Sequence, residues 1–119
     1  MTKKELAELL EKLGFKLIGS RFLKTNTEAS DYDYAITDEE VYKRTLLLLK
    51  ESGKLKYRQK DVYKDEYSGS ICVGQKKVGT ADILSLPITS DGAQFDLHCV
   101  EKILPKNKQM LLHLEKHGI

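Results

Sequence analysis

The chain has 119 residues, of which 40% are hydrophobic and 32% are charged, and its formal net charge is +2. This length accommodates one hydrophobic core and predicts a single domain spanning residues 1–119. The composition is typical of a globular protein and excludes a low-complexity or repeat protein. A net charge this small gives no reason to expect general binding of polyanions.

No segment has the pattern of a membrane span or a secretory signal peptide. The longest uninterrupted apolar run is Leu46 to Leu49, whereas a spanning helix needs about 20 apolar residues. We therefore expect a cytoplasmic protein without a membrane partner. Cys72 and Cys99 fit no CxxC or zinc spacing and are expected to be reduced thiols.

The first half of the chain predicts helix, strand, loop, strand and helix in this order. A capping-box pattern at Thr2 to Glu5, followed by leucines at helical spacing, predicts a helix that ends at Gly14. Residues 15–19 are expected to form a short strand, and residues 31–36 a second strand. Another capping-box pattern at residues 37–40 predicts a helix that ends at Gly53.

The second half predicts mainly strands. They are expected at residues 54–60, 62–67, 70–74, 78–86 and 94–100, with turns at 75–77 and 90–92. Pro105 occupies a typical first helical position for a last helix that ends at Gly118. These elements together predict an α+β fold, a mixed β-sheet with helices packed on one face.

Asp31 and Asp33 are the first candidates for a functional site. Residues two apart in a strand share a face, so Tyr32, Tyr34 and Ile36 can enter the core while both aspartates emerge on the open face. Two neighbouring carboxylates repel each other and favour a proton or a cation. Mg²⁺ suits such a pair because it binds one or two carboxylates and keeps sites for water and phosphate.

Gly19, Ser20 and Arg21 form a second candidate group at the end of the preceding strand. Glycine allows the backbone to approach a ligand closely. Backbone N–H groups that follow it, together with the Arg21 guanidinium, are suited to holding phosphate oxygens.

This arrangement resembles the DNA polymerase β-type nucleotidyltransferase superfamily. The resemblance rests on Ile18-Gly19-Ser20, a spacer of ten residues, and Asp31-Tyr32-Asp33 followed by apolar residues 34–36. The residues of this stretch are most similar to those of small nucleotidyltransferases encoded by phages or paired with toxins. The resemblance covers residues 1–52 clearly and the remainder by element order. The chain differs at Lys24-Thr25, where many members have a glycine.

The resemblance implies a nucleotidyltransferase-like fold and a Mg²⁺-dependent transfer of a nucleoside monophosphate from an NTP to a hydroxyl acceptor on RNA, another nucleic acid or protein. Two Mg²⁺ ions would be held by Asp31 and Asp33. Gly19, Ser20 and Arg21 would hold the β- and γ-phosphates.

The same resemblance requires a third carboxylate, for which the sequence offers Asp82 and Asp96. If residues 89–92 form a hairpin loop, Ile88 pairs with Ala93, and Asp82 then faces the core. In that register Asp96 lies on a polar face with Gln94 and His98. This favours Asp96 as the residue that completes the metal site and helps activate the acceptor hydroxyl. A one-residue change in the loop would favour Asp82 instead.

Other interpretations remain open. The same cleft could belong to a catalytically silent module that binds a nucleotide or a protein, and Asp31 and Asp33 could be surface carboxylates on an edge strand. One further strand carries basic residues at alternate positions, which would form either a wall for polyanions or a protected sheet edge. These residues are Lys54, Lys56, Arg58 and Lys60.

Overall fold

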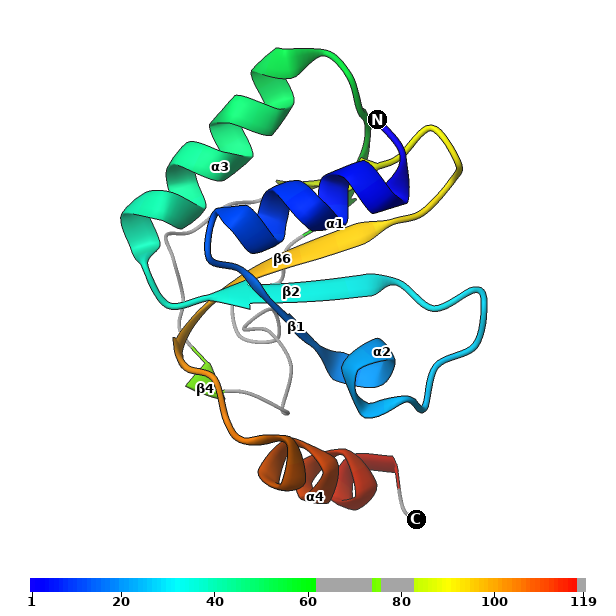
Figure 1. The fold of residues 1–119 in the computed structure, drawn as a ribbon, viewed down its shortest axis with the longest axis vertical. Coiled ribbons are helices and arrows are strands. Elements are labelled where there is room, and N and C mark those ends of the chain that lie inside the picture. Colours follow the sequence, from blue (N-terminus) through cyan, green and yellow to red (C-terminus); the bar gives the residue numbers. More distant parts are fainter. Residues whose placement is uncertain (62–73, 76–82, 118–119) are drawn as a thin grey trace.

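The computed structural model describes residues 1–61, 74–75 and 83–117. The chain folds as an α+β protein, which confirms the predicted class (Figure 1). The elements in chain order are α1 (Lys3–Lys12), β1 (Lys16–Ile18), α2 (Gly19–Leu23), β2 (Tyr32–Ile36), α3 (Glu39–Ser52), β3 (Lys56–Asp61), β4 (Gly74–Gln75), β5 (Ile83–Ile88), β6 (Phe95–Lys102) and α4 (Lys106–His117). The strand predicted at 62–67, most of the strand predicted at 70–74, and both Cys72 and Asp82 lie outside the described residues.

The main sheet is mixed, as expected, with the strand order β1-β2-β6-β4. β1 runs antiparallel to β2, β2 runs parallel to β6, and β4 runs antiparallel to β6. β3 and β5 pair antiparallel to each other in a separate two-stranded sheet. The central pair, β2 and β6, therefore joins two segments that are far apart in the sequence.

Helices α1 and α3 cover one face of the main sheet (Figure 1). Alternate residues of β2 and β6 point toward these helices and form the main core. Its buried members are Leu6, Leu10, Phe15, Tyr34, Ile36, Tyr42, Leu49, Leu55, Phe95, Leu97 and Cys99. The prediction of helices on one face holds for α1 and α3, whereas α2 and α4 contact each other beyond the end of β1.

The ends of the two long N-terminal helices follow their sequence signals, with one correction. Thr2 and Glu5 form the predicted capping box of α1. The N-cap of α3 is Asp38, whose side chain accepts a hydrogen bond from the Val41 amide, so the capping box predicted from Thr37 is wrong by one position. Gly53 ends α3 in the left-handed conformation, as expected.

The predicted pairing of Ile88 with Ala93, which was to join the strands expected at 78–86 and 94–100, is wrong. β5 pairs with β3, and in the described part of the chain it is connected to the segment before β6 by an antiparallel bridge between Ile88 and Gln94. The loop has three residues, because the Thr89 amide donates to the Ala93 carbonyl and Gly92 adopts a positive φ of 82°. The register is therefore shifted by one residue from the predicted pairing of Ile88 with Ala93.

A second correction concerns residues 19–23. The predicted strand ends at Ile18, and the Gly-Ser-Arg stretch begins the five-residue helix α2. A helix of this length has too few residues to produce a periodic apolar pattern, so no sequence pattern indicated it. Within the described ranges, no helix is both long and apolar enough to cross a membrane.

Candidate functional site

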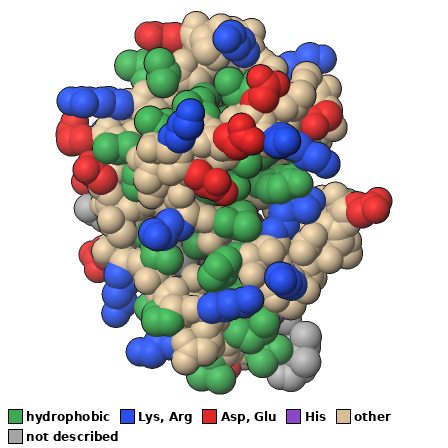
Figure 2. Space-filling view, in the orientation of Figure 1, with side chains coloured by type: hydrophobic (Ala, Val, Ile, Leu, Met, Phe, Trp, Pro, Cys, Tyr) green, Lys and Arg blue, Asp and Glu red, His purple; other side chains and the backbone are tan. Residues whose placement is uncertain are grey.

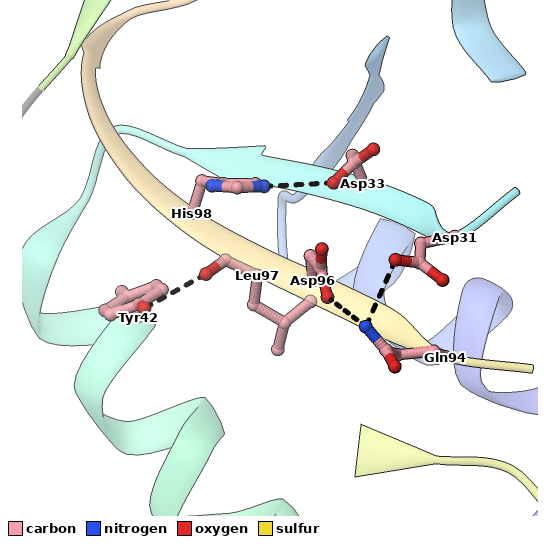
Figure 3. A network of polar contacts seen from close by, with 7 residues as sticks. All are labelled: Asp31, Asp33, Tyr42, Gln94, Asp96, Leu97 and His98. Atoms are coloured by element: carbon pink, nitrogen blue, oxygen red, sulfur yellow. Dashed lines mark hydrogen bonds and ion pairs between the residues drawn. The ribbon is translucent and has the colours of Figure 1, made fainter. Parts of the chain in front are cut away.

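The site is built on the face of the β2–β6 pair that points away from α1 and α3. Asp33 and Asp96 are register partners on these parallel strands, and Asp31 lies one residue before β2. Figure 3 shows the three carboxylates on the same side of the strand pair, with Tyr42 of α3 on the opposite side. The structure thus places together the three aspartates that the sequence selected.

Gln94 joins two of these carboxylates. Its side-chain Nε2 donates to Asp31 Oδ2 at 3.1 Å and to Asp96 Oδ1 at 3.2 Å (Figure 3). One neutral amide thus brings its positive end between two acidic groups, which reduces their mutual repulsion without supplying a full charge.

His98 is the partner of the third carboxylate. Its Nε2 lies 3.1 Å from Asp33 Oδ1, and the side chains of His98 and Asp33 are 9% and 25% exposed. The imidazole therefore fixes one oxygen of Asp33 at a largely enclosed position. His98 lies on β6, as Asp96 does, and reaches across to Asp33 on β2 (Figure 3).

The surroundings of Asp96 shift the pKa of its carboxyl. Burial raises the pKa of its carboxyl, and the charges of Asp33 and Asp31 raise it further. The hydrogen bond from Gln94 and the nearby His98 act in the opposite direction. The group therefore holds a proton more readily than an ordinary aspartate, which is the property expected of a carboxylate that accepts a proton from a substrate.

Gly19 packs directly against the site. Its φ is +74°, and a Cβ at this position would lie 2.9 Å from Asp33 Oδ2 and 3.3 Å from Asp33 Cβ. Only glycine satisfies both the backbone conformation and the close approach. The glycine selected from the sequence is thus required by the Asp33 carboxylate itself.

Arg21 is committed to the loop between α2 and β2. Its Nε and Nη2 donate to the Ser30 carbonyl at 3.1 and 2.8 Å, and Nη2 also donates to the Glu28 carbonyl at 3.1 Å. The guanidinium also lies over the Tyr32 ring, 3.8 Å from its centroid. Arg21 therefore fixes the loop that leads into Asp31.

Lys24 takes a conformation that glycine normally supplies. It ends α2 with φ 60° and ψ 34°, in the left-handed region. The backbone turn is made here with lysine.

The reason for preferring Asp96 over Asp82 needs correction, although Asp96 does lie beside Asp33. The preference came from a hairpin register that the structure does not contain. The position of Asp96 follows instead from alternation along β6, where Phe95, Leu97 and Cys99 are buried, and from its pairing with Asp33. Asp82 lies outside the described residues.

The basic strand lies outside the main sheet. Lys56 begins β3, which pairs only with β5 in the described part of the chain, and both Lys54 and Lys56 are exposed. The side chains of Arg58 and Lys60 are outside the described set. Their interpretation as a polyanion wall stays a prediction.

Sequence reasoning did not assign roles to Gln94 and His98. It placed both on the polar face with Asp96, because all three alternate with Phe95, Leu97 and Cys99. What it lacked was the parallel pairing of β6 with β2, which brings Gln94 to Asp31 and His98 to Asp33.

The three carboxylates suit Mg²⁺ in the chemistry of their donors. Carboxylate oxygens are preferred Mg²⁺ ligands, and the raised pKa of Asp96 reflects a cluster that favours added positive charge. Within residues 1–61, 74–75 and 83–117, no group of three or more His, Cys, Asp or Glu side chains is arranged to hold a metal ion.

Comparisons with known proteins add no family assignment. No family model matches the chain, and no curated protein or solved structure shows significant similarity to it.

Proposed function

We propose that the protein is a Mg²⁺-dependent nucleotidyltransferase, which moves a nucleoside monophosphate from an NTP to a hydroxyl group of RNA or protein. The observation that carries this proposal is the convergence of three aspartates from two neighbouring parallel strands. Asp33 and Asp96 are register partners, and one amide contacts both Asp31 and Asp96. The resemblance of the Gly-Ser and Asp-x-Asp segments to the nucleotidyltransferase superfamily supports the same assignment.

Asp31, Asp33 and Asp96 would hold the metal. Two Mg²⁺ ions bound there would stabilise the charge that develops on the attacking and leaving oxygens. Asp96 would also accept the proton of the acceptor hydroxyl, a role that its position beside Asp33 supports. His98 would keep the Asp33 carboxylate in one orientation through the 3.1 Å contact.

Gly19 and Ser20 would border the phosphates of the nucleotide. The contact distances around Gly19 support this role, because its Cα lies against the Asp33 carboxylate with no room for a side chain. Arg21 would reach a phosphate only after leaving the carbonyl groups of Glu28 and Ser30. Its present contribution is to fix the loop before Asp31.

The alternative is a catalytically silent module that binds a nucleotide or a protein. It is favoured by the existing contacts of the carboxylates, since Gln94 and His98 already act as partners of all three aspartates. In such a module these contacts would be a permanent substitute for metal.

The first test is thermal unfolding with Mg²⁺ or Mn²⁺ and each of the four NTPs. At about ten times the Kd, preferential binding to the folded protein should raise the Tm by roughly 5 °C. Asp31→Asn combined with Asp33→Asn should abolish this rise. Asp38→Asn is the matched control, because it removes one exposed charge while asparagine retains the N-cap of α3. An unchanged rise in the double variant would contradict the metal assignment.

The second test separates the enzyme from the silent module. Each NTP, labelled in its α-phosphate, is incubated with the protein, Mg²⁺ and a cell extract, and label is sought in protein and RNA. The enzyme should transfer label and lose this activity in Asp96→Asn. A metal-dependent rise in Tm without any transfer would favour the binding module.

A further inference from the structure

A pocket of about 450 Å³ lies beside β1, the outermost strand of the main sheet among the described residues, between α2 and the N-terminal end of α4. It contains none of the carboxylates described above. Its walls are mainly apolar and combine two aromatic rings with aliphatic side chains. The apolar residues are Phe15, Leu17, Phe22, Ile103, Leu104 and Pro105. This volume falls in the range of pockets that bind small molecules.

Gln109 gives the pocket a specific polar group. Its side chain is 1% exposed, and its Nε2 donates to the Leu104 carbonyl at 2.8 Å. That carbonyl can only accept a hydrogen bond, so the orientation of the amide is determined and Oε1 must face away from it. In the described part of the chain, Gln109 Oε1 is buried without a hydrogen-bond partner.

A buried oxygen without a hydrogen-bond partner destabilises the folded protein when no ligand is bound. Water is lost from the oxygen on burial, and no protein donor in the described ranges replaces it. A ligand N–H or O–H in the pocket would remove this cost once the Gln109 side chain turns its oxygen toward the ligand. The same residue that lines the pocket thus specifies a donor on the ligand.

The charges around the pocket favour an anion. Lys16 and Lys106 line it together with one acidic residue, Glu11. Lys106 also begins α4, whose first N–H groups point away from the helix body and carry partial positive charge. The Lys106 ammonium lies 5.6 Å from the centroid of the Phe22 ring, which holds it at the pocket wall. Around α4, in the lower part of Figure 2, Lys and Arg side chains are more prominent than Asp and Glu.

We propose that this pocket binds a small organic anion with a flat apolar body and one N–H or O–H donor directed at Gln109 Oε1. The aromatic and aliphatic walls would contact the flat body of the ligand, and Lys16 and Lys106 would bind its carboxylate. The proposal does not depend on the nucleotidyltransferase function, because none of its residues belongs to the carboxylate site.

The test uses indole-3-acetate, which combines a flat apolar body, one N–H donor and one carboxylate. Binding to the full chain is followed by NMR through the backbone amide signals. Indole-3-acetate should shift the signals of Leu17, Phe22 and residues 103–109 in a saturable manner. No saturable shift at millimolar ligand would overturn the proposal.

Two matched ligands test the recognition. 1-Benzothiophene-3-acetate replaces the N–H by sulfur at nearly the same size, and it should bind about fivefold more weakly, the equivalent of one hydrogen bond. 3-Methylindole keeps the donor and lacks the carboxylate, so it should also bind more weakly. Equal affinity for the indole and benzothiophene acids would show that Gln109 Oε1 does not receive a ligand donor.

Protein variants locate the two interactions. Gln109→Met keeps an unbranched side chain but removes the acceptor, so it should bind the indole and benzothiophene acids equally. Lys16→Gln and Lys106→Gln should each weaken the binding of indole-3-acetate several-fold. Lys108→Gln is the control on the same helix, because Lys108 is exposed and does not line the pocket. If Gln109→Met fails to fold, the comparison of the two acids on the parent protein still decides the donor contact.

Discussion

The two faces of the β2–β6 pair are made from alternate residues of the same strands, yet they are built in opposite ways. On the face under α1 and α3, Tyr34, Phe95 and Leu97 are each no more than 3% exposed and pack in one cluster. On the other face, Asp33 and Asp96 are paired, and each is only partly buried. One face removes apolar area from water, whereas the other brings like charges together.

This contrast places a stabilising face and an energetically costly face on one short strand pair. Burial of aromatic and aliphatic side chains supplies the free energy of folding on the covered face. The polar face carries a carboxyl whose pKa is raised by burial and by its acidic neighbours, which means that folding penalises its charge. Such a cost is expected where side chains are kept for binding or catalysis.

The largest effect is expected on the covered face. Phe95 is fully buried and stacks on Tyr32 at a centroid distance of 4.8 Å and on Tyr34 at 5.8 Å. Phe95→Ala should therefore lower the free energy of unfolding by about 3–5 kcal/mol, measured by urea denaturation. Leu111→Ala, at a position that is 61% exposed, should change it by less than about 0.5 kcal/mol. A small loss in Phe95→Ala would show that this face is not the main source of stability.

The second-largest effect is expected at Gly19, whose backbone packs against the polar face. Gly19→Ala should cost about 2–4 kcal/mol, because it combines a positive φ with a Cβ 2.9 Å from Asp33 Oδ2. Gly53 has a similar φ of +67° and no heavy atom within 4 Å of a Cβ, so Gly53→Ala should cost only about 1 kcal/mol. The difference between the two variants measures the contact with Asp33. Equal losses would mean that the Asp33 carboxylate moves away without cost.

The smallest effect is expected at Asp96, where a substitution should raise the free energy of unfolding. The pKa of Asp96 is raised above the unfolded value of about 3.9, so the folded protein retains a proton that the unfolded chain has already lost. Stability from this group is complete below the unfolded pKa and is lost as the pH rises through the folded pKa. Asp96→Asn should therefore be more stable than the parent protein at pH 7 without metal, and this advantage should narrow toward pH 3.

Urea midpoints at a series of pH values measure this difference, with Asp38→Asn as the exposed control. If Asp96→Asn were less stable than the parent at pH 7 and matched it at pH 3, the hydrogen bond from Gln94 and the nearby His98 would outweigh the burial of the charge.

The elements with local signals could be predicted from the sequence. The capping box at Thr2 and Glu5, the alternation from Tyr32 to Ile36 and the terminal Gly53 all act over a few residues, and the structure contains the helices and the strand that they indicate. The same alternation correctly put Asp31 and Asp33 on the face away from the core. Local chemistry was sufficient at these positions because the core decides which face each residue takes.

The parts that failed depend on pairing between distant segments or on single residues in a turn. The turn at Ser90 to Gly92 lies where it was predicted, but the predicted register assumed a loop of residues 89–92, and β5 pairs with β3. Asp96 was selected through this incorrect register. Its true neighbour, Asp33, follows from parallel pairing of β2 with β6, which no local pattern specifies.

The parallel pairing of β2 with β6 also sets the time at which the carboxylate site can form. Gln94 and Asp31 are separated by 63 positions in the sequence, and His98 and Asp33 by 65. Closing so long a loop is slow compared with forming α1 or the β1–β2 pair, whose contacts are local. During synthesis, the segment with Asp31 and Asp33 leaves the ribosome well before its partners exist. The two aspartates must remain in water until residues 94–98 arrive, so ligand binding at this site should appear among the last events of folding.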